Sequence, residues 1–103
     1  LPEACERVVQ QTIDAFGRID GLVNGPGEND KVGLETGNYE AFAGSLRRNL
    51  LPDYLIAHHA LPHLKATRGC IVNLNTSAGE TGQGQTSGYA AASGARNALT
   101  REW

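Results

Sequence analysis

The stretch "CIVNLNTSAGETGQGQTSGYAAASGA", residues 70 to 95, carries the clearest structural signal in this chain of 103 residues. It opens with a β-branched, apolar run at residues 70–75, which is typical of a strand. A glycine-rich loop follows, and the small residues from about Ser87 to Trp103 predict a final helix. In layered α/β proteins the ligand lies beyond the carboxyl ends of the strands, so this loop is a candidate site.

The residues before this stretch predict a second strand with helices around it. "GLVN" at 21–24 is a short apolar run that ends in glycine and proline, as a buried strand leaving a sheet does. The opening segment predicts an amphipathic helix that stops at Gly17. Its apolar residues share one helical face: Ala4, Val8, Val9, Ile13 and Phe16.

A long helical region is predicted between the two strands, over residues 38–66. Asn38 is placed to cap its start. Pro52 cannot donate a backbone hydrogen bond, so we expect a kink near Arg48 and Asn49, and Pro62 is expected to disturb the last turns. The order helix, strand, helix, strand, helix predicts an α/β fold with parallel strands joined by a helical crossover.

Composition narrows the possible partners. The chain has nine Lys and Arg against eleven Asp and Glu, a net charge of -2, and no basic cluster. We therefore expect neither nucleic acid nor a membrane as a partner. With no apolar run long enough to span a bilayer and no leader-like start, the expected location is cytoplasmic. Cys5 and Cys70 are interpreted as reduced core residues. Because methionine is absent, the chain is interpreted as a piece of a longer protein.

Two other patterns are interpreted as having no direct role in binding. His59 and His63 lie four residues apart on a predicted helix, but no third ligand is suitably placed, so no metal site is expected. The "GQG" at 82–84 lacks the spacing and the lysine of a phosphate-binding loop, and a flexible loop on the substrate side is the favoured reading.

Taken together, four pieces form a specific pattern. They are "DGLVNGPG", "SLRRNL", "GCIVNLNTS" and a tyrosine, Tyr89, thirteen residues after Thr76. Their order and spacing resemble the short-chain dehydrogenase/reductase family, with most likeness to sugar or polyol dehydrogenases of the L-fucose dehydrogenase type. The resemblance implies a partial Rossmann-type three-layer parallel sheet with helices on both faces. Residues 1–103 would be a single incomplete Rossmann-like segment.

The resemblance also implies a four-residue site. Tyr89 lies at the position of the family's acid/base tyrosine, and Thr76 at that of the serine that hydrogen-bonds the substrate oxygen. Asn49 lies where the family has an asparagine that orders a relay water. Ser93 lies where the family has a lysine. A hydride transfer to a carbonyl needs a proton donor at the oxygen, and a nearby cation lowers the pKa of a tyrosine so that it can also act as a base.

The implied cofactor is NAD or NADP. By resemblance, Asn24, Gly25, Gly27 and Tyr89 would contact it. The expected reaction is an NAD(P)-dependent alcohol and carbonyl interconversion by an oxidoreductase, on a small-molecule substrate resembling a sugar or a polyol. The family's first strand, its phosphate-binding glycine loop and its adenosine-ribose selector all precede the segment matched here.

The sequence departs from the family pattern at the cation. Ser93 is uncharged and too short to reach a nicotinamide ribose. Arg96 lies on the same helical face as Tyr89, but about 10 Å of helix rise separates their backbones, so it is not expected to replace the lysine. Gly25 replaces the second asparagine of the family's strand-end motif.

Three interpretations of function follow. The first is a short-chain oxidoreductase. The second is a catalytically degenerate relative that acts as a binding or dimerisation module, which Ser93 and Gly25 favour. The third is a fragment without independent function. We also expect a homo-oligomer with a twofold interface formed by the helical regions 38–66 and 87–103. Suitable contact residues are Leu50, Leu55, Leu61, Ala95 and Leu99.

Overall fold

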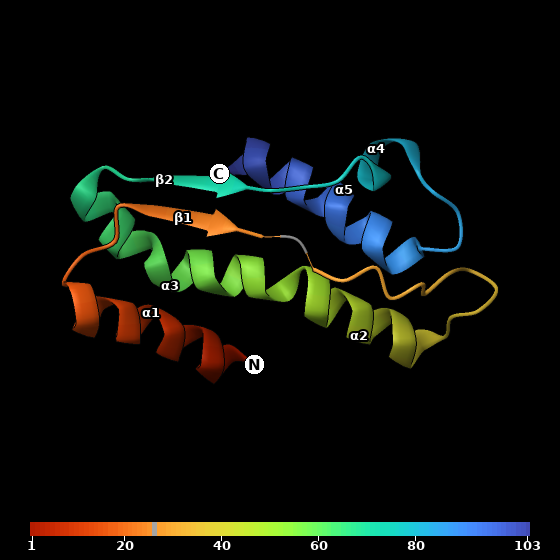
Figure 1. Ribbon diagram of the computed structural model, residues 1–103, viewed down its shortest axis with the longest axis horizontal. Helices are drawn as coiled ribbons and strands as arrows, with labels where there is room; N and C mark the ends of the chain where they lie inside the picture. The colour runs from red at the N-terminus through yellow and green to blue at the C-terminus, as the bar shows by residue number, and fades with distance from the viewer. Residues whose placement is uncertain (26) are drawn as a thin grey trace. The chain divides into compact units, whose positions relative to one another are not determined.

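The structure is a computed structural model that describes residues 1–25 and 27–103 (Figure 1). Its elements follow one another as α1 (Pro2–Phe16), β1 (Gly21–Asn24), α2 (Tyr39–Asn49), α3 (Leu51–Thr67), β2 (Cys70–Asn73), α4 (Ala78–Thr81) and α5 (Ser87–Glu102). Strands β1 and β2 pair in a two-stranded sheet and run in the same direction. The predicted order of helices and strands is confirmed, apart from the short helix α4, which was expected to be a loop.

The chain forms two compact units. The first unit contains residues 1–24 and 52–72, and the second contains residues 25–51 and 73–103. The first unit therefore holds α1, β1, nearly all of α3 and most of β2. The second unit holds α2, α4, α5 and the loops that follow the two strands.

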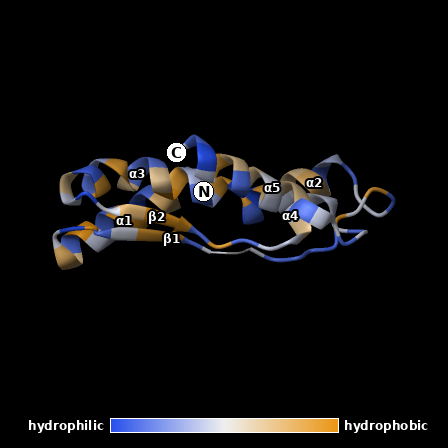
Figure 2. Ribbon diagram, turned by 90° about the horizontal axis from the view of Figure 1, so that it is seen from above, coloured by the Kyte–Doolittle hydropathy of each residue, from blue (hydrophilic) through white to orange (hydrophobic). Residues whose placement is uncertain are grey.

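The first unit is built around an apolar cluster of Val9, Ala60 and Leu64. Partly buried residues pack against it from the strands and helices: Ile19, Leu22, Ile56 and Ile71. Both strands are strongly hydrophobic (Figure 2). Burial of this apolar surface is the main stabilising contribution in the unit, at about 25 cal/mol per Å².

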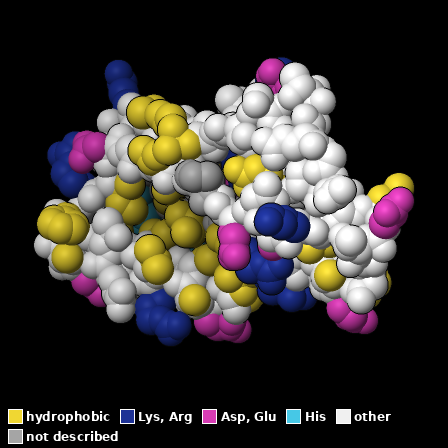
Figure 3. Space-filling model, turned by 45° about the vertical axis from the view of Figure 1, so that its right-hand side comes forward, with side chains coloured by type: hydrophobic (Ala, Val, Ile, Leu, Met, Phe, Trp, Pro, Cys, Tyr) yellow, Lys and Arg dark blue, Asp and Glu magenta, His cyan; other side chains and the backbone are white. Residues whose placement is uncertain are grey.

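Alternation along the strands explains why their second face is exposed. Leu22 and Ile71 pack on the cluster, so their neighbours Val23 and Val72 point to the opposite face. Val23 is 61% exposed and Val72 46% exposed. The prediction that residues 21–24 form a buried strand is therefore wrong for one face of β1 in this chain. Large hydrophobic side chains such as these lie on the surface of the molecule (Figure 3).

Helix α1 ends as predicted, but the residues that it buries differ from the predicted apolar face. Gly17 has a φ of 79°, and its N–H donates to the carbonyl of Ile13. This left-handed conformation favours glycine. Cys5 and Val9 are the buried residues of the helix, whereas the predicted face residue Phe16 is 79% exposed. A helix face only about 100° wide meets the core, and it is centred on Cys5 and Val9 rather than on Phe16.

Three further predictions about local structure have clear outcomes. Strand β2 ends at Asn73, two residues before the predicted end. Cys70 is exposed and not a core residue, because it opens this strand, whereas Cys5 is buried; both are free thiols. Helix α3 runs through Pro62 to Thr67, so Pro62 does not end it.

The second unit begins its helical part as the sequence predicts. The side chain of Asn38 accepts a hydrogen bond of 2.8 Å from the N–H of Ala41 and caps α2. Helix α2 ends at Asn49 and α3 starts at Leu51, so the break expected from Pro52 is confirmed.

Glycines allow the helices of the second unit to approach closely. A Cβ on Gly79 of α4 would lie 2.6 Å from the backbone nitrogen of Gly94 and 2.8 Å from the Cβ of Ser93, both in α5. A Cβ on Gly88 of α5 would collide with the side chain of Ser45 in α2. Of the helices in the described part of the chain, none has the length and apolar character needed to cross a membrane.

Candidate active site

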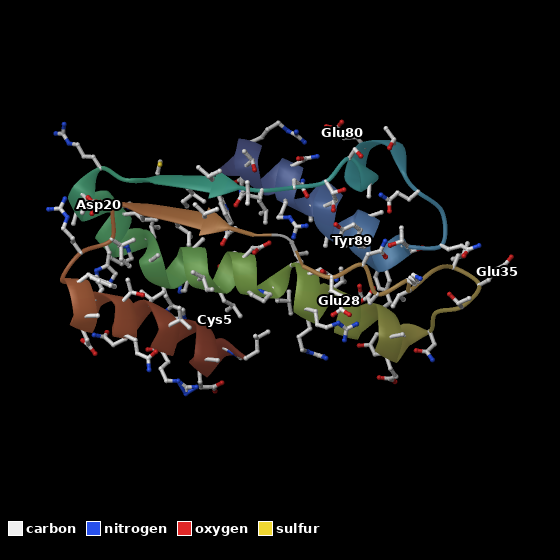
Figure 4. All side chains as sticks on the ribbon, viewed as in Figure 1. Cys5, Asp20, Glu28, Glu35, Glu80 and Tyr89 are labelled. Atoms are coloured by element: carbon white, nitrogen blue, oxygen red, sulfur yellow. The ribbon has the colours of Figure 1, made fainter. Side chains whose placement is uncertain are left out.

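Helix α5 carries two of the predicted site residues, Tyr89 and Ser93, four positions apart and hence on the same face. Tyr89 is half-buried, and Figure 4 shows it in the first turns of the helix. Ser93 is completely buried, at 0% exposure. Within the described residues its Oγ atom has no hydrogen-bond partner. A buried hydroxyl without a partner is uncommon and costs about 1–3 kcal/mol.

The start of α5 is held by the segment that follows β1. The hydroxyl of Thr86 donates to the side chain of Asn29 at 2.7 Å, and the N–H of Gly88 donates to the carbonyl of Val32 at 3.2 Å. Thr86 is 5% exposed. These bonds set the position of the turn that carries Tyr89.

Asn49, the last residue of α2, is an anchor for the same segment. It is 2% exposed, and its Oδ1 atom accepts a hydrogen bond of 2.5 Å from the N–H of Glu28. Its Nδ2 atom donates to the hydroxyl of Ser45 at 3.3 Å. A Cβ on Gly27 would collide with this asparagine side chain, so only glycine fits there. The amide of Asn49 thus ties the loop after β1 to helix α2.

The carbonyl of Asn49 makes a different contact. It accepts a hydrogen bond from Nη1 of Arg96, a residue of α5 that is 1% exposed. Nε of Arg96 donates to the side chain of Asn75 at 3.2 Å. The side chain of Asn75 in turn donates to the carbonyl of Ser93 at 2.6 Å and to the side chain of Asn97 at 2.8 Å. Arg96 therefore connects the end of α2 and the segment after β2 to the helix that carries Tyr89.

Thr76 lies between β2 and α4. Its side-chain oxygen accepts a long hydrogen bond, 3.4 Å, from the N–H of Ala78, at the start of α4. Thr76 is half-buried, whereas the neighbouring hydroxyl residue Ser77 is exposed.

A charged cluster of Asp30, Arg48 and Ser45 connects the segment after β1 to helix α2. The carboxylate of Asp30 accepts hydrogen bonds from Ser45 at 3.0 Å and from Arg48 at 2.5 Å. Burial of Asp30 raises the pKa of its carboxyl, but the hydrogen bonds from Arg48 and Ser45 and the charge of Arg48 outweigh this, and the net effect lowers that pKa. Asp30 therefore stays ionised at neutral pH and keeps this segment attached to α2.

The residues implied in cofactor binding are divided between the two units. Asn24 ends β1 in the first unit, is 4% exposed and donates to the carbonyl of Asp53 at 3.4 Å. The second unit contains the other implied residues, namely Gly25 and Gly27 near its start and Tyr89 in α5. Apart from its chain neighbours, no atom of the described residues lies within 4 Å of the position of a Cβ on Gly25. Pro26, the remaining residue of this strand-end motif, lies outside the described residues.

All four predicted catalytic positions, Asn49, Thr76, Tyr89 and Ser93, belong to the second unit. Hydrogen bonds connect Asn49 and Ser93 through two residues whose part sequence reasoning missed, Arg96 and Asn75. One signal for Arg96 was available: it lies on the same helical face as positions 89 and 93, which is the buried face of α5. No signal in the sequence indicated Asn75.

Comparison with known proteins gives consistent results for sequence and structure. L-fucose dehydrogenase of Oryctolagus cuniculus is 38% identical over 100 residues, which cover 96% of this chain and 35% of that protein. Glucose and ribitol dehydrogenase homolog 2 of Arabidopsis thaliana is 31% identical over 99 residues, 96% of this chain and 34% of that protein. The chain spans about a third of the length of these relatives.

Two solved structures share the fold over nearly the whole chain. Cj0485 dehydrogenase has 36% identity and a TM-score of 0.95, with 100% of this chain and 40% of that chain covered. Levodione reductase has 31% identity and a TM-score of 0.91, with 99% and 40% covered. The predicted fold class, a partial Rossmann-type α/β fold, is confirmed by these matches. The profile described as short chain dehydrogenase matches residues 2–103, and the chain belongs to this short-chain dehydrogenase family.

Proposed function

We propose that the polypeptide carrying this chain is an NAD(P)-dependent oxidoreductase that interconverts an alcohol and a carbonyl group. The observation that carries the proposal is the second unit itself. It contains a half-buried tyrosine, a half-buried threonine and a buried asparagine at the family's catalytic positions, in a chain matched by the family over residues 2–103. Both compact units are proposed to be parts of one incomplete Rossmann-like segment.

In the proposed reaction Tyr89 acts on the proton of the substrate oxygen. Its hydroxyl gives that proton when a carbonyl is reduced and takes it when an alcohol is oxidised. Thr76 donates a hydrogen bond to the same oxygen and orients it. Asn49 holds the loop after β1 through its contact with Glu28, and so keeps that loop in place next to the site. Ser93 occupies the position from which a cation is missing.

The residues of the chain fit a nicotinamide cofactor in part. Gly25 leaves open space beside the backbone at the end of β1, and the half-buried Tyr89 offers a hydroxyl. Ser93 is fully buried and does not offer a contact to a ribose. The cofactor would supply or accept the hydride. Whether it is NAD or NADP depends on a selector outside the matched segment.

The substrate is proposed to be a sugar or a polyol. The relatives named as L-fucose dehydrogenase and as glucose and ribitol dehydrogenase homolog support this class. A homo-oligomer and a cytoplasmic location stay predictions from the sequence.

The test is a screen of the polypeptide that carries this chain. NAD and NADP are each offered with L-fucose, with ribitol and with an unrelated secondary alcohol, and formation of the reduced cofactor is followed by absorbance. The expected result is turnover of a sugar or polyol that is lost in Tyr89→Phe and kept in Tyr54→Phe, since Tyr54 is an exposed tyrosine on α3. Absence of turnover with both cofactors and all three substrates contradicts the proposal.

One observation favours the second candidate, a degenerate relative that acts as a binding or dimerisation module. Position 93 has lost its charge, and its remaining hydroxyl is buried without a partner in the described part of the chain. This reading predicts cofactor-independent self-association through the helical regions that contain Leu50, Leu55, Leu61, Ala95 and Leu99. Sedimentation that shows only a monomer at micromolar concentration contradicts it.

A further inference from the structure

Arg96 is a large, fully buried cation in the second unit. Its side chain is 1% exposed, and an arginine stays charged at all pH values relevant to proteins. Burial of such a charge is strongly unfavourable unless hydrogen bonds compensate it. A structure therefore keeps a buried arginine only where its hydrogen bonds are well made.

Two of these bonds connect Arg96 to other elements of the unit. Nη1 donates to the carbonyl of Asn49, at the end of α2, where helical carbonyls lack partners within the helix and where a cation is favourable. Nε donates to the side chain of Asn75, which follows β2. Both bonds start from the helix that carries Tyr89, so one guanidinium holds three chain segments together.

The position of Arg96 complements the change at position 93. Residues 93 and 96 are three apart and lie on one face of α5. The same face has a neutral Ser93, with no partner for its Oγ among the described residues, and a charged Arg96. The asparagine side chain of Asn75 joins the two positions, because it accepts from Arg96 and donates to the carbonyl of Ser93.

We propose that Arg96 is a positioning residue of the Tyr89 site, which its buried guanidinium holds in place through hydrogen bonds to Asn49 and Asn75. The proposal rests on the proposed function. Arg96 does not touch the reacting atoms. It acts through Asn49, whose carbonyl it holds and whose side chain anchors Glu28 and the loop after β1.

The first test removes the charge in the polypeptide that carries this chain. Arg96→Met keeps the length of the side chain and removes the charge, and it is expected to lower kcat about 10- to 100-fold while KM changes less than about threefold. Arg101→Met, at an exposed position of the same helix, is the matched control and should leave kcat unchanged.

The second test does not depend on activity. The N–H of Glu28 reports on Asn49, because it donates to the Asn49 side chain. Its hydrogen exchange is expected to become about tenfold faster in Arg96→Met and to stay unchanged in Arg101→Met. If Arg96→Met does not fold, Arg96→Lys takes its place. This variant keeps the charge but loses part of the hydrogen bonding to Asn49 and Asn75. It should lower kcat about threefold without a change in KM.

The outcomes separate this proposal from the proposed function. Wild-type kcat in Arg96→Met or in its lysine replacement, or an unchanged exchange rate at Glu28, overturns the role of Arg96. If the wild-type polypeptide turns over no substrate with NAD or NADP, the proposed function fails. The exchange rate at Glu28 then still decides whether Arg96 positions Asn49.

Discussion

The two compact units use different kinds of contact. In the unit of residues 1–24 and 52–72 the centre is an apolar cluster of Val9, Ala60 and Leu64. In the unit of residues 25–51 and 73–103 several polar side chains are deeply buried, among them Arg96, Ser45 and Ser93. Apolar burial stabilises without direction, whereas hydrogen bonds place particular atoms. We infer that the first unit is a scaffold and that the second holds the chemistry.

The largest effect that this comparison predicts is on activity and lies in the second unit. Tyr89→Phe removes the hydroxyl that is proposed to give and take the proton, and we expect turnover by the polypeptide that carries this chain to fall about 10³-fold or more. The aromatic ring remains, so the melting temperature should change little. Steady-state kinetics and thermal unfolding check the two parts. A Tyr89→Phe variant with substantial activity would remove the second unit from the chemistry.

The converse effect is expected in the first unit. Leu64 is 4% exposed in the apolar cluster, so Leu64→Ala should lower the free energy of unfolding by about 2–5 kcal/mol. Leu61 on the same helix is 44% exposed, and Leu61→Ala should cost about 0.5 kcal/mol or less. Denaturant unfolding of both variants measures the difference. Equal losses at the two positions would show that this cluster is not the centre of the scaffold.

A smaller effect concerns the close packing of α4 on α5 in the second unit. Alanine normally stabilises a helix relative to glycine, by about 1 kcal/mol. At position 79 we expect the opposite sign, because the new Cβ would lie 2.6 Å from the backbone nitrogen of Gly94 and 2.8 Å from the Cβ of Ser93. Gly79→Ala should therefore lower the free energy of unfolding by about 1–3 kcal/mol.

The control for this variant is Gly25→Ala, since a Cβ at that position meets no atom of the described residues within 4 Å, apart from the chain neighbours of Gly25. The Gly25→Ala substitution should leave the free energy of unfolding nearly unchanged. If Gly79→Ala instead raises the melting temperature, helix α4 does not pack on α5 as described.

The same difference between the units decides how much could be predicted from sequence. The apolar periods of the first unit predicted α1, β1 and β2, and Gly17 and Pro52 predicted where helices stop. These are local signals, and each depends on neighbouring residues alone. Phe16 and Cys70 were misplaced because burial depends on what packs against a residue, and that is not a local property.

The second unit could be predicted only in part. The resemblance to a family assigned Asn49, Thr76 and Tyr89 to one catalytic site, which stays a prediction, and all three residues belong to the second unit. The bonds from Arg96 to Asn49 and to Asn75 join residues 47 and 21 positions apart. An arginine reaches several ångströms along and across a helix, so the spacing of residues along α5 could not predict which distant segments its guanidinium contacts.

The smallest expected effect appears when one ion pair from each unit is compared. In the second unit, Arg48 lies 2.5 Å from Asp30, whose side chain is 10% exposed. In the first unit, Arg18 lies 2.7 Å from Asp20, and both side chains are more than 60% exposed. The pKa of Asp30 is lowered on folding, so the folded state binds a proton less readily than the unfolded chain, in which an aspartate has a pKa of about 3.9. The stabilising contribution is therefore complete above about pH 5 and is lost as the pH falls through the folded pKa. Because Arg48 is half-exposed, we expect Asp30→Asn to lower the free energy of unfolding at pH 7 by only about 1 kcal/mol, and by less at pH 3.

Asp20→Asn is the matched control, and its effect should be smaller and should disappear in high salt, since solvent and salt screen an exposed pair. Unfolding curves from pH 3 to pH 7 at two salt concentrations check this difference. Equal pH dependence in the two variants would mean that the charged cluster around Asp30 is no more protected from solvent than the surface pair of the scaffold.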